Sequence, residues 1–120
     1  MKLTDKELEL MQVLWERGAS MTTFEIITAS PERTWKDASI HVMLRTLQTK
    51  GAVVLEDFVP STGRPSGTYK ATLTLEEYAL LQMKGHSVDI GKLFAALIND
   101  KEYRKAFKES GWHLEKKPPK

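Results

Sequence analysis

Hydrophobic residues recur at the 3.6-residue spacing of an α-helix in several separate segments of this 120-residue chain. Residues 4–17 carry a wide apolar stripe ending in Leu14 and Trp15, and this aromatic end is expected to lie in the core. A second long helix is predicted over residues 35–50, with an apolar face formed by Ile40, Met43, Leu44 and Leu47. The pattern also predicts shorter helices over residues 22–29, 75–84, 88–99 and 101–110, the last being the weakest.

The starts of these helices are marked by a threonine followed three residues later by an acid. The hydroxyl can accept a hydrogen bond from the third helical N–H, while the acid accepts one from the N–H of the cap residue. The pairs are Thr4/Glu7, Thr22/Glu25, Thr34/Asp37 and Thr74/Glu77. Basic residues followed by Gly18, Gly51 and Gly85 predict the ends, because glycine tolerates the left-handed backbone just past a helix.

Between residues 52 and 73 the pattern changes to short β-branched and alternating segments. Residues 52–59 and 68–73 are predicted strands, and residues 60–67, which include Arg64, have the composition of a turn. The order helix, short helix, helix and hairpin is that of a winged helix-turn-helix. The predicted fold is therefore mainly α with a small β-hairpin, and the hairpin loop is the predicted wing.

In such a module the third helix enters the DNA major groove and the wing follows the phosphates. The predicted base-reading residues on the polar face of helix 35–50 are Ser39, His41 and Arg45. The predicted phosphate contacts are Thr22, Thr23, Lys36, Lys50, Arg64 and Lys70. The alternative for each is an ordinary solvated side chain. Metal binding by His41 is not expected, because the sequence has no His or Cys at metal spacing nearby.

Composition narrows the class of protein. A chain of this length, with 41% hydrophobic residues, suits one compact unit with a small appendage. With no cysteine, disulfides and thiolate metal sites are excluded. The sequence shows no membrane span, signal segment or catalytic constellation, so we expect a cytoplasmic protein that is not an enzyme and needs no cofactor.

The distribution of charge along the chain, rather than the net charge, favours a polyanionic partner. The net charge is only +2, but residues 33–70 hold six basic and three acidic side chains. The predicted reading helix and wing therefore lie in the segment whose local charge is positive, as DNA binding requires.

A narrow apolar stripe in the C-terminal region suggests an interface between two copies of the chain. Its residues are Ile90, Leu93, Phe94, Leu97 and Ile98. Folding back onto the first helix is the alternative. We therefore divide the chain into a DNA-binding domain (residues 1–84), helical dimerisation segment (85–112) and flexible basic tail (113–120).

Four segments resemble the penicillinase repressor family, which includes the β-lactamase and methicillin-resistance repressors and copper-responsive relatives. They are residues 3–15, ending in Leu14-Trp15, and residues 22–27, 35–51 and 67–71. The combination of Leu14-Trp15 with the Leu47-x-x-Lys50-Gly51 stop carries most of the likeness. The resemblance implies a dimeric repressor that binds a two-fold symmetric operator and dimerises through C-terminal helices.

The chain also departs from that family. It lacks the Asn-Phe bond at which β-lactam-sensing members are cleaved and the cysteine-rich hook of copper-responsive members, so neither response is carried over. A sensor protease remains a candidate partner alongside the DNA operator and a second copy. The competing function is a winged-helix module for protein–protein contact without DNA binding.

Overall fold

The computed structural model describes residues 1–110, which belong to two compact units, Met1–Gln82 and Met83–Lys120. The boundary falls within a helix, two residues before the expected domain end at residue 84. The elements are α1 (Asp5–Arg17), β1 (Met21–Thr22), α2 (Thr23–Thr28), the 3₁₀ turn η1 (Asp37–Ser39), α3 (Ile40–Lys50), β2 (Val53–Val59), β3 (Ser66–Ala71), α4 (Leu75–Gly85), α5 (Ile90–Asn99) and α6 (Lys101–Glu109). The expected tail at residues 113–120 lies outside the described residues, as do 111–112 of the expected dimerisation segment.

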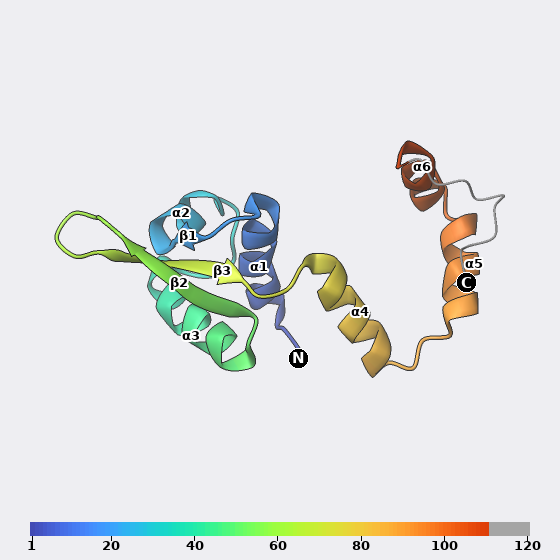
Figure 1. Ribbon diagram of the computed structural model, residues 1–120, viewed down its shortest axis with the longest axis horizontal. Coiled ribbons are helices and arrows are strands. Elements are labelled where there is room, and N and C mark those ends of the chain that lie inside the picture. The colour runs from blue at the N-terminus through green and yellow to red at the C-terminus, as the bar shows by residue number, and fades with distance from the viewer. Residues whose placement is uncertain (111–120) are drawn as a thin grey trace. The chain divides into compact units, whose positions relative to one another are not determined.

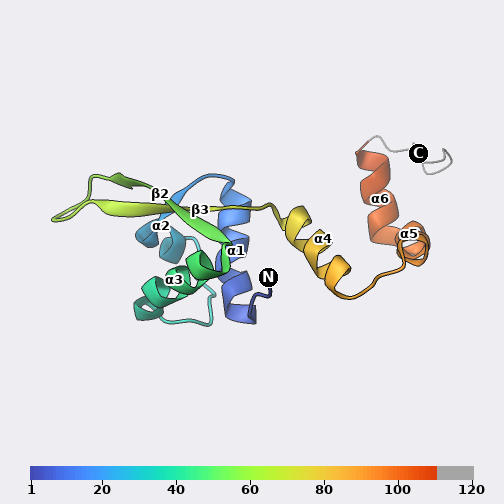
Figure 2. The same ribbon diagram turned by 60° about the horizontal axis from the view of Figure 1, so that its bottom comes forward.

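The first unit is a winged helix, as predicted, but its sheet has three strands rather than two. The hairpin of β2 and β3 is extended by β1, giving the antiparallel order β1-β3-β2. Met21 pairs with Tyr69 and Thr22 with Thr68, so the link between α1 and α2 joins the sheet edge. Figures 1 and 2 both show the hairpin projecting beyond the helices of this unit. A two-residue strand has too little alternation to be recognised from sequence.

One hydrophobic core holds α1, α2, α3 and the sheet together. Its fully buried large side chains are Leu10, Met11, Leu14, Met21, Ile26, Ile40, Leu44 and Leu47. Trp35 and Tyr78 belong to the same cluster, while Trp15 packs against it partly exposed. The placement of both predicted tryptophans in or against the core is confirmed.

Three of the four predicted helix starts are confirmed. Thr4 with Glu7 and Thr22 with Glu25 form complete capping boxes. Thr74 and Glu77 exchange the same pair of hydrogen bonds, of 2.9 and 3.0 Å.

The start predicted at Thr34 and Asp37 is wrong. The backbone N–H and hydroxyl of Thr34 instead donate to the carboxylate of Glu9 on α1, 2.8 and 2.5 Å away. Asp37 pairs with Arg33, and η1 begins without a side-chain cap. Regular α-helix therefore begins at Ile40, five residues later than predicted.

Two of the three predicted glycine stops are confirmed. Gly18 and Gly51 adopt left-handed backbone, with φ of 68° and 81°. Gly85 does not, because it is the last residue of α4, and the positive φ of 52° falls two residues later at Ser87.

The second unit consists, within the described residues, of the end of α4 followed by α5 and α6. Asp89 and Asp100 cap α5 and α6 by accepting hydrogen bonds from backbone N–H groups of each helix's first turn. No residue of α5 or α6 is buried. Within residues 1–110, no helix combines the length and the apolar character needed to span a bilayer.

Candidate nucleic-acid interface

The turn that leads into α3 is held by Arg33, a residue whose structural role the sequence patterns did not reveal. Its guanidinium donates to the carbonyl oxygens of Ile27 and Ser30 at the end of α2, at 3.4 and 3.0 Å. It also pairs with Asp37 of η1 and lies 5.0 Å from the ring centroid of Trp35. These contacts link the end of α2 to the start of α3, so the two helices of the helix-turn-helix are fixed relative to one another.

The other end of α3 is fastened by Lys50. Its ammonium lies 2.5 Å from Glu7 Oε1 in the first turn of α1 and 2.9 Å from the Lys2 carbonyl oxygen. Burial raises the pKa of Glu7, but hydrogen bonds from Lys50 and the Thr4 backbone outweigh this effect and bring the pKa below its ordinary value. The buried carboxylate is therefore ionised at neutral pH and paired with Lys50.

The exposed face of α3 is defined by the residues opposite its buried side. Ile40, Leu44 and Leu47 face the core, and with 3.6 residues per turn the positions most nearly opposite are Val42, Arg45 and Thr49. We call these three residues the outer ridge, and all three are exposed. Arg45, a predicted base reader, lies at its centre.

The other two predicted base readers lie beside the outer ridge. His41 is exposed and lines a cleft next to the wing. Ser39 is half-buried in η1, because the delayed start of α3 places it in the 3₁₀ turn rather than in regular helix. The structure therefore brings Arg45 and His41 to the same exposed side of α3 and leaves Ser39 less accessible.

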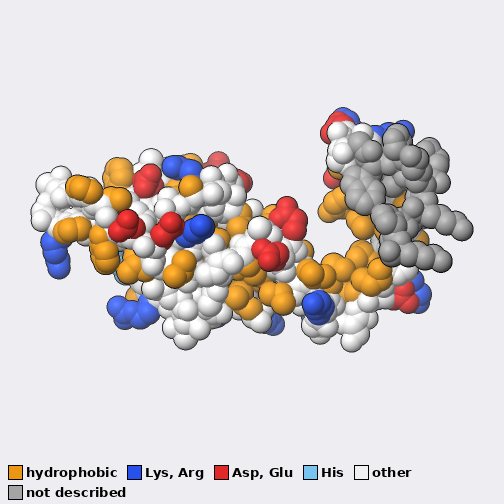
Figure 3. Space-filling view, viewed as in Figure 1, with side chains coloured by type: hydrophobic (Ala, Val, Ile, Leu, Met, Phe, Trp, Pro, Cys, Tyr) orange, Lys and Arg blue, Asp and Glu red, His pale blue; other side chains and the backbone are white. Residues whose placement is uncertain are grey.

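The wing and the start of α3 enclose a cleft of about 450 Å³. It brings together Thr23 at the start of α2, His41 and the wing loop with Arg64, three residues that the sequence placed in the interface. Arg64 is exposed in the loop that joins β2 and β3. Gly63 beside it has φ of 90°, a backbone that L side chains rarely adopt, which makes the loop tip tight. A basic patch at the far end of the hairpin is visible in Figure 3.

Lys36, the remaining predicted phosphate contact on this segment, is exposed immediately before η1. It therefore lies near the start of α3.

Three other predicted phosphate contacts have different surroundings. Lys50 is engaged with Glu7, as described above. The Thr22 N–H donates to Glu25 at 2.9 Å, and this bond together with the Thr22 hydroxyl lowers the pKa of Glu25. A phosphate at Thr22 would therefore meet a carboxylate that stays charged. Lys70 lines a separate cavity and not the wing cleft.

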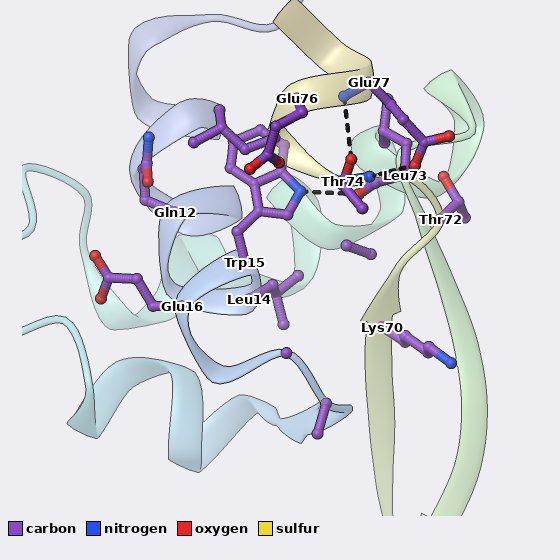
Figure 4. A pocket seen from close by; sticks show the side chains of 14 residues that line it. Gln12, Leu14, Trp15, Glu16, Lys70, Thr72, Leu73, Thr74, Glu76 and Glu77 are labelled. Atoms are coloured by element: carbon purple, nitrogen blue, oxygen red, sulfur yellow. Dashed lines mark hydrogen bonds between the residues drawn. The ribbon is translucent and has the colours of Figure 1, made fainter. Parts of the chain in front are cut away.

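That second cavity, also about 450 Å³, lies between the end of α1, β3 and the start of α4 (Figure 4). Trp15 forms its wall, and the indole N–H donates to the Leu73 carbonyl oxygen at 2.9 Å. Glu77 is engaged in the cap of α4. Trp15 also packs against Tyr78 of α4, with ring centroids 5.9 Å apart, and this contact joins the start of α4 to the winged helix.

The apolar stripe predicted for dimerisation lies on α5, and its five residues are all at least partly accessible. Ile90 and Phe94 are 64% and 39% exposed, and Leu93, Leu97 and Ile98 are half-buried. Figure 3 shows hydrophobic side chains on the surface of the second unit. Trp112, which follows α6 in the sequence, lies outside the described residues.

The described part of the chain offers no cluster of three or more His, Cys, Asp or Glu side chains suited to a metal ion. The arrangement of α2, the Arg33 turn, the exposed α3 and the projecting hairpin defines a winged helix-turn-helix protein.

Comparison with known proteins places the chain in a family. Residues 3–105 match the sequence profile of the penicillinase repressor family, and the chain belongs to that family. The penicillinase repressor of Bacillus licheniformis is 28% identical over 86 residues, which cover 72% of this chain and 62% of that repressor. The match thus spans less than two thirds of the curated relative. A solved PadR family transcription regulator from Clostridium difficile shares 14% identity and a TM-score of 0.48, covering 80% of this chain and 96% of that one.

Proposed function

We propose that this protein is a transcription repressor that binds double-stranded DNA through α3 and the wing. The observation that carries the proposal is the outer ridge of α3, exposed beside a cleft that contains Thr23, His41 and Arg64. A major groove about 12 Å wide admits one α-helix, and the adjoining wing then meets the phosphates. Membership of the penicillinase repressor family supports repression as the outcome of binding.

Base reading is assigned to the exposed side of α3. Arg45 can donate two hydrogen bonds to the O6 and N7 atoms of guanine, and His41 can reach a base edge on the side of the helix nearer the wing. Ser39 contributes at the start of the helix, where it is half-buried and needs close approach of the DNA.

Phosphate binding is assigned to Thr23, Lys36 and Arg64, which have the exposure or the position for it. We leave Lys50, Thr22 and Lys70 out of this set. Lys50 already has an anionic partner, Glu25 would repel a phosphate at Thr22, and Lys70 lines a different cavity.

Dimerisation is assigned to α5. Exposure of such an apolar stripe to water is unfavourable, so a partner surface that covers it is expected. A two-fold operator also needs two reading helices about 34 Å apart. A second copy of the same segment supplies a matching apolar surface through an isologous contact. Ile90 and Phe94, the most exposed members of the stripe, would lie in that interface.

A salt series tests DNA binding against the competing role in protein–protein contact. The full chain is mixed with fluorescein-labelled duplexes from its own promoter region, and anisotropy is measured from 50 to 300 mM KCl. DNA binding predicts affinity that falls steeply and linearly on logarithmic axes, because cationic side chains release counterions from phosphates. Absence of binding to any promoter fragment at 50 mM KCl would favour the protein–protein module instead.

A further inference from the structure

The hydrogen-bonding groups of the exposed helix face are largely used within the helix itself. The hydroxyl of Thr46 donates to the Val42 carbonyl oxygen at 3.0 Å, and that of Thr49 donates to the Arg45 carbonyl oxygen at 3.0 Å. A hydroxyl has one hydrogen to donate. Within the outer ridge, Arg45 is therefore the side chain that can donate hydrogen bonds to bases, while Thr49 offers a methyl group and an acceptor.

Val42 has no structural reason to be apolar. Val42 is 64% exposed, so its side chain adds little to the core formed by the opposite face of α3. In the major groove, base edges present hydrogen-bond donors and acceptors, and the apolar group among them is the C5-methyl of thymine. A valine side chain has no polar atom, so this methyl group is the feature of a base that it can recognise.

We propose that Val42 is a specificity-determining residue that contacts a thymine methyl group in the major groove. This inference rests on the proposed DNA binding through α3. Val42 and Arg45 are three residues apart, which is about 4.5 Å along the helix, against about 3.4 Å per base pair. The thymine and the base contacted by Arg45 therefore lie within one or two base pairs of each other in each half-site.

Replacing thymine by deoxyuridine tests this contact, because the substitution removes the C5-methyl group and keeps the base pair. A preferred duplex is first selected from a random 30-base-pair library with the full chain. Each thymine pair related by the two-fold axis is then replaced in turn, and affinity is measured by fluorescence anisotropy. Burial of one methyl-sized group contributes about 0.8 kcal/mol, which is about fourfold per half-site and about fifteenfold for both.

Val42→Ala identifies the residue that makes the contact. At the sensitive position, the ratio of affinities for the thymine and deoxyuridine duplexes should fall from about fifteen toward one in this variant. Val54→Ala is the matched control, since Val54 is an exposed valine, 47% accessible, on β2. That variant should keep the full ratio. Circular dichroism checks that both variants remain folded.

The possible results distinguish a failure of the Val42 contact from a failure of DNA binding itself. A duplex that is selected and bound, but in which no deoxyuridine replacement weakens binding, overturns the role of Val42 and leaves DNA binding by α3 intact. Retention of the full ratio in Val42→Ala overturns it as well. Failure to select any DNA sequence overturns the proposed function and this inference together.

Discussion

Replacing Lys50 by methionine should destabilise the winged helix. It should leave DNA binding by the folded protein unchanged, because Lys50 is paired with Glu7 and is not among the proposed phosphate contacts. Methionine keeps the aliphatic stem and removes the ammonium that lies 2.5 Å from Glu7 Oε1. A hydrogen bond to a charged group contributes about 1.5–3 kcal/mol net. The Lys50 side chain is 29% exposed, so water partly screens the pair, and we expect a loss near the lower end, about 1.5–2 kcal/mol.

The loss should depend on pH in a defined direction. The folded-state pKa of Glu7 is lowered from its ordinary value, so ionised Glu7 contributes stability that is fully present above its unfolded pKa. This contribution disappears as the pH falls through the folded-state pKa and the carboxylate takes up a proton. The difference between the parent and Lys50→Met should therefore be full at pH 7 and should shrink as the pH falls through the lowered folded-state pKa of Glu7.

Urea unfolding at pH 7 and at a series of lower pH values, followed by tryptophan fluorescence in a Trp112→Phe background, measures this difference. The signal then comes from Trp15 and Trp35, both in the first unit. Lys6→Met, which removes an exposed lysine of α1 in the same unit, is the control and should change stability little. A loss under about 0.5 kcal/mol at pH 7, or a loss that does not shrink at any pH down to the lowest at which the protein stays folded, would refute the reasoning. A DNA salt slope lowered by about one would instead identify Lys50 as a phosphate contact.

Three further predictions concern DNA binding and assembly. Arg45→Ala should reduce binding to the selected duplex by about 1–3 kcal/mol with an unchanged melting curve, and unchanged affinity would contradict base reading by α3. Arg64→Ala should weaken binding to all duplexes about equally and lower the salt slope by about one, whereas a changed sequence preference would contradict a phosphate role. Leu93→Asp combined with Leu97→Asp should convert a dimer to a monomer in sedimentation at tens of micromolar and weaken operator binding. A monomeric parent chain that still binds a two-fold operator tightly would rule out the α5 interface.

Features encoded by a few neighbouring residues could be predicted from the sequence. A capping box such as Thr4 with Glu7 needs only residues three positions apart, and the geometry of one helical turn brings them together. The left-handed stop at Gly51 likewise depends on one residue and the turn before it. The winged-helix order followed from combining such local signals with the spacing of apolar residues.

The error at Thr34 shows where local reasoning ends. Thr34 and Asp37 have the spacing of a capping pair, but Glu9, 25 residues away in sequence, offers Thr34 two hydrogen bonds. Hydrogen bonds from the Thr34 hydroxyl and backbone lower the pKa of Glu9, so its carboxylate is charged at neutral pH. Glu9 accepts hydrogen bonds from both Thr34 donors, while the carboxylate of Asp37 pairs with Arg33 instead. The competing partner becomes visible only when α1 is placed beside the turn.

The later start of α3, at Ile40 rather than residue 35, also explains why Ser39 is less accessible than the sequence predicted. If the regular helix had begun at residue 35, Ser39 would have occupied its second turn, where reading helices meet base edges. Because the 3₁₀ turn occupies residues 37–39, the first exposed position on the outer ridge within α3 is Val42. The sequence placed both Arg45 and Val42 away from the apolar face of the helix, but it chose only Arg45 as a base reader, because a valine side chain has no hydrogen-bonding group. The 64% exposure of Val42 is what distinguishes it as a contact residue, since a valine so accessible adds little to the core.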